Sequence, residues 1–275
     1  MALFGLILNT IHESMKRKMF ILFFGFSTLI LILFLFVLNV DIIDKGIGTI
    51  KLIAYNDASV DLVQLVRTSQ AVVAAVLFVF GILVSTLATA SIIPGFQMPG
   101  YIDLVLSKPV SRPVIILGKY FGAVIIVGIN VFYLVGGVWL ILSAKTGIWN
   151  FGFLASGGTI LVTYAIIMAV MTFLGIFTKS TVLSILIAYV FLNFMSFILV
   201  TLVKVPNVFR LLSPFWKKAA TALYHFFPKL FELFAMTGIL VKGDSVPDWS
   251  VLWTSVIFGV VFLGFSMLLF SRKDY

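Results

Sequence analysis

The chain contains no cysteine, and only 11% of its 275 residues carry charge. The missing cysteine excludes disulfides, cysteine-ligated zinc and thiol catalysis. Soluble domains are typically about 25% charged and about 45–50% apolar, whereas 62% of this chain is hydrophobic. With a mean hydropathy of +1.21, the protein has too little polar surface to cover a globule against water. The composition therefore excludes an ordinary soluble enzyme, a disordered tail and a disulfide-rich secreted domain, and it predicts an integral membrane protein.

Sequence motifs for catalysis and metal binding are also lacking. The only two histidines, His12 and His225, are far apart in the sequence, so we expect no histidine-based metal site. No phosphate-binding Gly-x-x-x-x-Gly-Lys-Ser/Thr loop, no His-Glu-x-x-His and no Gly-x-Ser-x-Gly occurs. We therefore expect no catalytic residue, no metal, no cofactor and no ATPase activity in this chain.

The net charge of +9 would indicate a nucleic-acid partner in a soluble protein. In a membrane protein, basic residues gather at the ends of apolar spans and face anionic lipid headgroups. We therefore expect membrane lipid opposite these charges, and no nucleic acid.

Long apolar runs are what the sequence has in abundance. About 20 apolar residues in a helix cross the hydrocarbon of a bilayer, and runs of that length predict an all-α integral membrane protein with six transmembrane helices in a single domain, 1–275. The predicted spans cover about residues 19–40, 68–93, 120–144, 157–178, 180–203 and 251–270. The fourth begins after a turn-like Ser156–Gly158. Only Lys179 separates the fourth from the fifth, where a tight turn is a better interpretation than one very long helix.

The distribution of Lys and Arg predicts the orientation, because positive residues favour the cytoplasm. An even number of spans places both termini on one side, and basic residues precede the first span at Lys16–Lys18 and follow the last at Arg272 and Lys273. Over the whole chain, nine basic residues fall on the side of the membrane that holds the termini and ten fall on the other side, so this count does not decide the orientation. Six of those ten lie in the segment 204–248, and without it the count is nine against four. We predict cytoplasmic termini.

Two segments outside the spans are amphipathic. Residues 1–18 place apolar side chains along one helical stripe and end in a basic cluster, which predicts an interfacial helix; an extension of the first span is the alternative. Within 204–248, Pro228 divides an aromatic stretch into two helices that are too short to span, which we expect on or dipping into the outer face. Pro214–Lys218 is typical of an interfacial anchor.

A few polar residues fall in or near these apolar segments. Asn130 and Asn193 lie inside predicted spans and are candidates for hydrogen bonds between helices. Glu232 is the only carboxylate between Asp103 and Asp244, and it is a functional candidate if it enters the membrane. Gly118 and Gly122 would let two helix backbones approach closely, although this spacing is common by chance.

The loop after the second span has the most distinctive pattern. Pro99-Gly100 breaks any helix, Tyr101–Ser107 is long enough for about two turns, and Pro109 ends the segment. A helix of about residues 100–107 is too short to be stable alone. We therefore expect it to dock on a partner, with its polar groups toward that partner: Asp103, Lys108, Ser111 and Arg112.

Two motifs of this loop resemble a known family. Leu106–Arg112 (LSKPVSR) followed by Leu117–Gly122 (LGKYFG) is similar to the inner-loop signature of type-2 ABC exporter permeases, and most similar to the branch that includes the permease for nitrous-oxide-reductase maturation. The resemblance covers the whole chain: an amphipathic start, six spans, a long segment before the last span and the closing Phe270–Tyr275 (FSRKDY).

The resemblance implies that the helix at about 100–107 is a cytoplasmic coupling helix that rests in a groove of a separate ATPase subunit. It implies contacts to that subunit from Gly100, Tyr101, Asp103, Lys108, Ser111 and Arg112. It also implies two ATPase subunits that hold ATP and magnesium, a second permease copy, and the plasma membrane of a bacterium or archaeon. A periplasmic protein is a further candidate partner, because related complexes transmit force across the membrane.

The chain departs from the family at one place in this loop. Relatives carry acidic residues just before the glycine that matches Gly100, whereas this chain has Phe96–Pro99. The resemblance therefore does not carry over a carboxylate contact to the ATPase at that place.

A secondary transporter is the main alternative function, but such carriers place ionisable residues at mid-membrane and the predicted spans have almost none. A membrane-embedded enzyme would need a catalytic constellation that the sequence does not show.

Overall fold

A computed structural model describes residues 2–16, 18–37, 62–107, 109–206, 208 and 213–273. Over these residues the chain forms helices and no strand. Five helical stretches are long and apolar enough to cross a membrane: Val63–Phe96, Arg112–Thr146, Phe151–Thr178, Thr181–Lys204 and Ser250–Ser271. The prediction of an all-α membrane protein is therefore confirmed. A sixth stretch meets the criterion only if the first two helices are taken together as one bent pair.

The five stretches differ in regularity. The first contains α4 (Leu62–Val76), a π-helical segment η1 (Leu77–Gly81), α5 (Ile82–Thr89) and α6 (Ile92–Phe96). The fourth is likewise divided into α10 (Thr181–Ile185), the π-helical segment η2 (Leu186–Phe191) and α11 (Leu192–Lys204). The others are single helices: α8 (Arg112–Thr146), α9 (Phe151–Thr178) and α15 (Ser250–Ser271).

Several helix ends differ from the predicted spans: α4 begins at Leu62 instead of 68, and contacts within the fold explain the starts of α8 and α9. α8 begins at Arg112 instead of 120, since the charged Lys119 inside it is buried against a carboxylate. α9 begins at Phe151 instead of 157, because the side chain of Asn150 caps it by accepting from Gly152 N at 3.1 Å. The predicted turn at Ser156–Gly158 is wrong: these residues continue α9, and Gly157 lets the ring of Phe132 on α8 approach closely.

The N-terminal helices α1 (Ala2–Met15) and α2 (Lys18–Val37) are bent by 73° relative to each other. α1 packs across the start of α8. A Cβ at Gly118 would lie 2.6 Å from Leu6 Cβ, and one at Gly122 would lie 2.5 Å from Thr10 Cβ. The two glycines therefore form the surface on which α1 docks, and α1 is a separate helix, not a straight continuation of α2.

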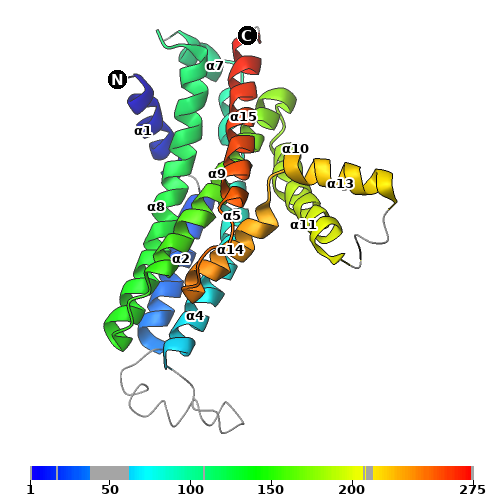
Figure 1. The fold of residues 1–275 in the computed structure, drawn as a ribbon. Coiled ribbons are helices and arrows are strands. Elements are labelled where there is room, and N and C mark those ends of the chain that lie inside the picture. The colour runs from blue at the N-terminus through cyan, green and yellow to red at the C-terminus, as the bar shows by residue number, and fades with distance from the viewer. Residues whose placement is uncertain are drawn as a thin grey trace.

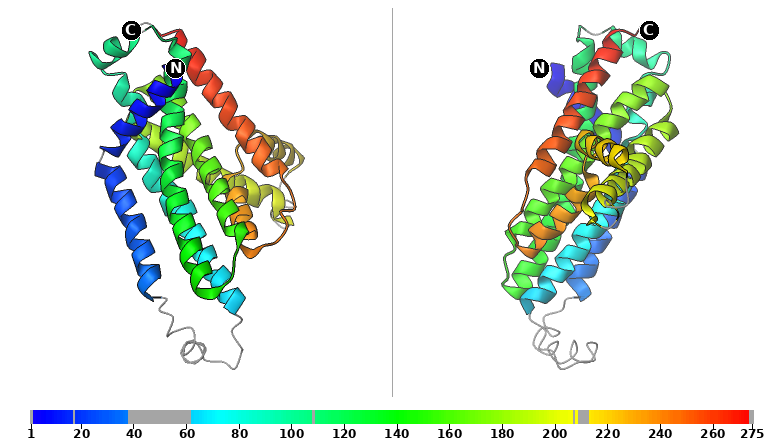
Figure 2. Two further views of the ribbon diagram at one scale, coloured as in Figure 1. Left: turned by 90° about the vertical axis from the view of Figure 1, so that its left-hand side faces the viewer. Right: turned by 45° about the vertical axis from the view of Figure 1, so that its right-hand side comes forward.

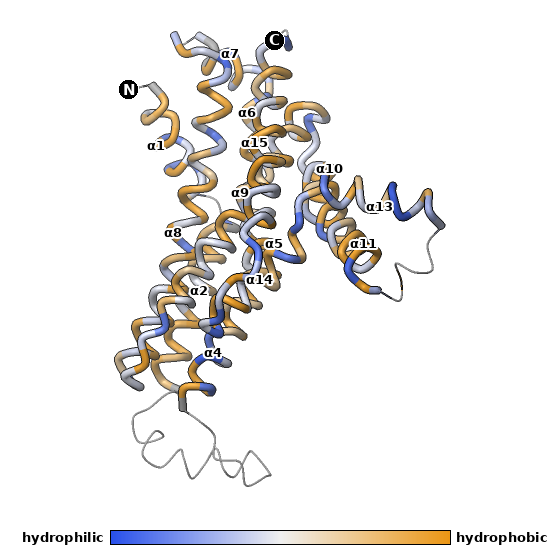
Figure 3. Tube along the Cα trace, in the orientation of Figure 1, coloured by the Kyte–Doolittle hydropathy of each residue, from blue (hydrophilic) through white to orange (hydrophobic). Residues whose placement is uncertain are grey.

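The bundle surrounds α9, which packs against α8, α14 and α15. Both termini and α7 (Tyr101–Leu106) lie at the same end of the bundle, which we call the α7 end (Figure 1). The connection between α8 and α9 lies at the opposite end (Figures 1 and 2). Apolar residues run along the whole bundle, and hydrophilic residues are conspicuous on α13 (Figure 3).

The segment before the last span holds two short helices, α13 (Pro214–Phe226) and α14 (Leu230–Lys242), on either side of Pro228. α14 packs against α9 and α4, and Thr237 and Thr159 join it to α9 by a hydroxyl–hydroxyl contact of 2.8 Å. α13 projects sideways beside α11 (Figure 1). We call α10, η2, α11 and α13 the wing.

Candidate functional site

The α7 end presents the short helix that the sequence predicts. Gly100 precedes α7 with φ of 83°, a conformation that glycine adopts without steric cost. Its N–H donates to Asp103 Oδ2 at 3.1 Å, which satisfies one free donor at the start of the helix. The Asp103 side chain remains exposed, and so does the ring of Tyr101.

The chain leading into α7 is anchored to the bundle. Gln97 is buried, and its Nε2 donates to Ile93 O at 3.1 Å and to Gly175 O of α9 at 3.0 Å. The ring of Phe96 packs edge-on against Phe270 of α15, with centroids 5.5 Å apart. These contacts attach the segment just before α7 to α9 and α15.

A buried ion pair ties α7 to the N-terminal helix. Lys119 of α8 is 1% exposed, and its Nζ lies 2.7 Å from Glu13 Oε2 of α1. The hydroxyl of Tyr101 donates to the same oxygen at 3.5 Å, and the Lys119 ammonium lies 5.6 Å from the centroid of the Tyr101 ring. Glu13, Lys119 and Tyr101, which we call the Glu13 cluster, therefore join α1, α8 and α7.

Arg112 has a different environment from the one predicted. Its Nη1 donates to Ser271 O at 3.2 Å and to Lys273 O at 2.6 Å, so it caps the carboxyl end of α15. Lys273 in turn donates to Ile176 O at the end of α9, at 2.6 Å. Burial, and secondarily the nearby Lys179, lowers the pKa of Lys273. Arg112 therefore joins the start of α8 to the end of α15, while Ser111 beside it is exposed.

A pocket of about 490 Å³ opens beside α7. One wall is the α6–α7 bend, including Met98, Ile102 and Asp103, and the other is the turn between α9 and α10, including Lys179 and Thr181. Lys179 adopts a left-handed conformation at φ of 54° as it ends α9. An acidic and a basic side chain, Asp103 and Lys179, thus both line the pocket. Lys108 lies outside the residues that the structure describes.

The other predicted candidates are not part of this site. Asn130, fully buried on α8, accepts from Ser27 Oγ of α2 at 2.9 Å, and this bond joins two helices. Asn193 donates to Tyr189 O at 2.7 Å, within its own helix. Asn130 therefore joins α8 to α2, and Asn193 bonds within its own span.

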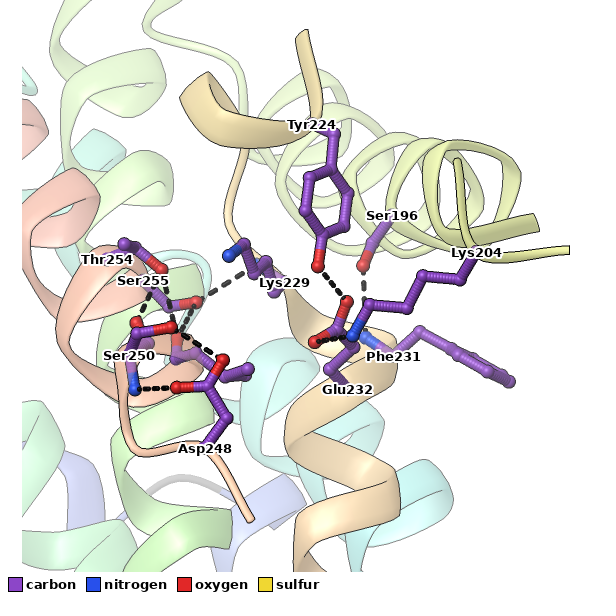
Figure 4. Close-up of polar contacts among 11 residues, drawn as sticks. Ser196, Lys204, Tyr224, Lys229, Phe231, Glu232, Asp248, Ser250, Thr254 and Ser255 are labelled. Atoms are coloured by element: carbon purple, nitrogen blue, oxygen red, sulfur yellow. Dashed lines mark hydrogen bonds and ion pairs between the residues drawn. The ribbon is translucent and has the colours of Figure 1, made fainter. Parts of the chain in front are cut away.

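Glu232 belongs to a polar cluster between the wing and α14 (Figure 4). Its side chain is 10% exposed, and Oε2 accepts from Lys204 Nζ at 2.9 Å. The hydroxyl of Tyr224 on α13 bonds to Oε1. Burial, and then this hydrogen bond to the carboxylate, raises the pKa of Tyr224. Glu232 therefore fastens α11 and α13 to α14.

Sequence reasoning overlooked Glu13, Lys119 and Gln97 as parts of the site. Lys119 directly follows Gly118, so it lies beside the helix face on which α1 packs, and this neighbourhood was the signal for it. Gln97 and Glu13 carry no local signal. Among the residues that the structure describes, no three histidine or carboxylate side chains gather as metal ligands would.

Comparison with known proteins returns no match: neither a family model nor a curated protein sequence matches this chain. The assignment of function therefore rests on the residues and on the geometry of the α7 end.

Proposed function

We propose that this chain is the transmembrane permease subunit of an ABC transporter of the type-2 exporter kind. In this proposal it crosses the plasma membrane of a bacterium or archaeon six times, with α1 as an interfacial helix, both termini and α7 in the cytoplasm, and α13 and α14 toward the outer face. Two separate ATPase subunits bind ATP and magnesium and dock on two permease copies. Their closure drives export of a substrate or transmits force to a periplasmic partner.

The observation that supports this proposal is the way α7 is held. A helix of six residues is not stable by itself, yet its base is fixed by Gln97 and by the Glu13 cluster. Its Asp103 is exposed and lines a pocket that Lys179 lines as well. An anchored helix with an exposed carboxylate is suited to receive a push from a partner and to pass it to α1, α8 and α9.

The chain itself contributes no chemical step in this mechanism. Motion of α7 reaches α1 and α8 through the Glu13 cluster and reaches α9 through Gln97. Arg112 and Lys273 hold the ends of α15 and α9 together, so these helices move as one body. ATP hydrolysis takes place in the partner.

Charge reversal at α7 tests the proposal. Asp103→Arg opposes the field of a complementary partner surface, so an affinity-tagged variant should insert normally but lose an ATPase subunit that wild type retains, together with stimulated hydrolysis. Asp103→Ala should have a smaller effect, since it removes a charge without opposing one. The matched control is Asp244→Arg, an exposed aspartate after α14, which should retain the partner.

Two outcomes would contradict the proposal. Wild-type protein that copurifies with no P-loop ATPase from its native membrane would favour a secondary transporter. Equal retention of the ATPase and of coupled hydrolysis in wild type and Asp103→Arg would show that α7 is not the docking element.

A further inference from the structure

Two spans of the bundle contain a π-helical segment. In η1 the N–H of Ile82 bonds five residues back to Leu77 O, and in η2 the N–H of Leu192 bonds five residues back to Ile187 O. Regular α-helices bond four residues back. π-Turns are rare and occur frequently where a helix has a functional irregularity. Here two of them occur in different spans of one small protein.

One side chain connects the two segments. The hydroxyl of Tyr189, in η2, donates to the backbone carbonyl of Val79, in η1, at 2.6 Å. Within its own span Val79 O also receives the N–H of Ile82, three residues on. A carbonyl of one π-turn therefore accepts from a side chain of the other. Without water to replace it, such a bond is costly to break in the hydrocarbon.

The two segments differ in how much of each is buried. In η2 only Ala188 is buried, while Leu186, Val190 and Phe191 are exposed. In η1 the side chains of Val79 and Phe80 are exposed, whereas Leu77, Phe78 and Gly81 are buried. Regions with few buried contacts are those that rearrange at low free-energy cost, so η2 is the segment that is freer to bend. Both spans rest on α9, a regular helix whose interior is buried, so α9 is the fixed body against which they would bend.

We propose that η1 and η2 form a paired hinge, closed by the bond from Tyr189 to Val79. With the bond made, α4 and α11 are held in one relative position. With the bond broken, α11 bends away from α4 at the π-turns, and the contacts of α14, which packs against both helices, loosen with it. This proposal concerns a conformational device and holds whether or not an ATPase binds α7. Within the proposed function, the hinge would set the resting position of the two spans.

Spin labels can test the hinge because the chain has no native cysteine. We would place one pair at the exposed positions Val72 of α4 and Phe197 of α11, and a reference pair at Ile129 of α8 and Val260 of α15. In Tyr189→Phe, loss of a membrane hydrogen bond should increase the separated population of the Val72–Phe197 pair about three- to tenfold. The distances of the reference pair should not change.

Tyr133→Phe is the matched control. Tyr133 likewise lies on a span, and its hydroxyl bonds to the Thr28 hydroxyl at 3.2 Å instead of to a π-turn carbonyl. It should leave both distance distributions at wild type. Amide hydrogen exchange gives a second measurement: exchange across 77–83 and 186–193 should accelerate in Tyr189→Phe and stay unchanged in Tyr133→Phe.

Unchanged distances and unchanged exchange in Tyr189→Phe would overturn the hinge. Equal effects of Tyr189→Phe and Tyr133→Phe would also overturn it, since the effect would then be that of any lost hydroxyl. Both measurements use the chain without an ATPase, so a negative result leaves the test at Asp103 unaffected, and a negative result at Asp103 leaves the hinge unaffected.

Discussion

One ion pair lies at the α7 end and another joins the wing to α14, and the two pairs differ in which partner is exposed. At the α7 end Lys119 is completely enclosed and Glu13 is about one-third exposed, with side-chain exposures of 2% and 33%. In the wing the exposures are reversed: Lys204 is 53% exposed and Glu232 is 10% exposed. The first pair lies under a docked helix, and the second lies at the edge of a projecting one.

This difference indicates what each region can do. A cation that is enclosed and paired holds α1, α8 and α7 in one arrangement, because any separation would leave the charge buried and unpaired. A lysine that reaches its carboxylate from the surface can exchange that partner for water or headgroups at little cost. The α7 end is therefore suited to transmit displacement, and the wing is suited to change position.

The largest effect is expected from Glu13→Ala. The substitution leaves Lys119 buried without its carboxylate, which should lower the free energy of unfolding by about 3 kcal/mol. Reversible unfolding in mixed micelles would measure it. The double variant Glu13→Ala/Lys119→Met should recover most of the loss, since replacing both members of a buried pair by apolar groups is close to neutral. A double variant as unstable as the single one would show that the pair is not the cause.

A smaller effect is expected from Gly122→Val. Its Cβ would lie 2.5 Å from Thr10 Cβ and 3.2 Å from Ile7 O, so α1 must move away from α8. Overpacking of this kind costs about 1–3 kcal/mol. Gly136→Val is the matched control on the same helix, because a Cβ there meets nothing within 4 Å. Equal stability of the two variants would contradict the docking of α1 on this surface.

The helices themselves could be predicted because their signal is local. A run of about 20 apolar residues marks a span wherever it occurs, and Pro228 marks a break by its missing N–H. The ends of a helix could not be predicted where a residue far away in the sequence pairs with a charged residue that would otherwise end the helix. Lys119 set the start of the predicted third span at 120, yet Glu13, 106 positions away, allows the lysine to lie inside α8. The π-turns could not be predicted either, because no periodic pattern in the sequence marks them.

The candidate site divides in the same way. The break at Gly100 could be predicted because its signal is local; Asp103 was predicted to face a partner, and the structure adds that its carboxylate accepts from Gly100 N–H at the start of α7. Arg112 was predicted to face a partner, but the carbonyl of Lys273, 161 positions away, accepts from it. Glu232 was predicted as an isolated carboxylate, and only the fold brings Lys204 and Tyr224 to it. Long-range pairs of this kind need the tertiary structure.

The smallest effect is expected from Lys204→Ala. Because more than half of the Lys204 side chain is exposed and Tyr224 still donates to Glu232, the loss of stability should be about 1 kcal/mol or less. The same loss should diminish in high salt, which screens an exposed pair, whereas the effect of Glu13→Ala should persist. Lys218→Ala, at an exposed lysine of α13, controls for charge removal alone. A salt-independent loss as large as that of Glu13→Ala would show that the wing is held as rigidly as the α7 end.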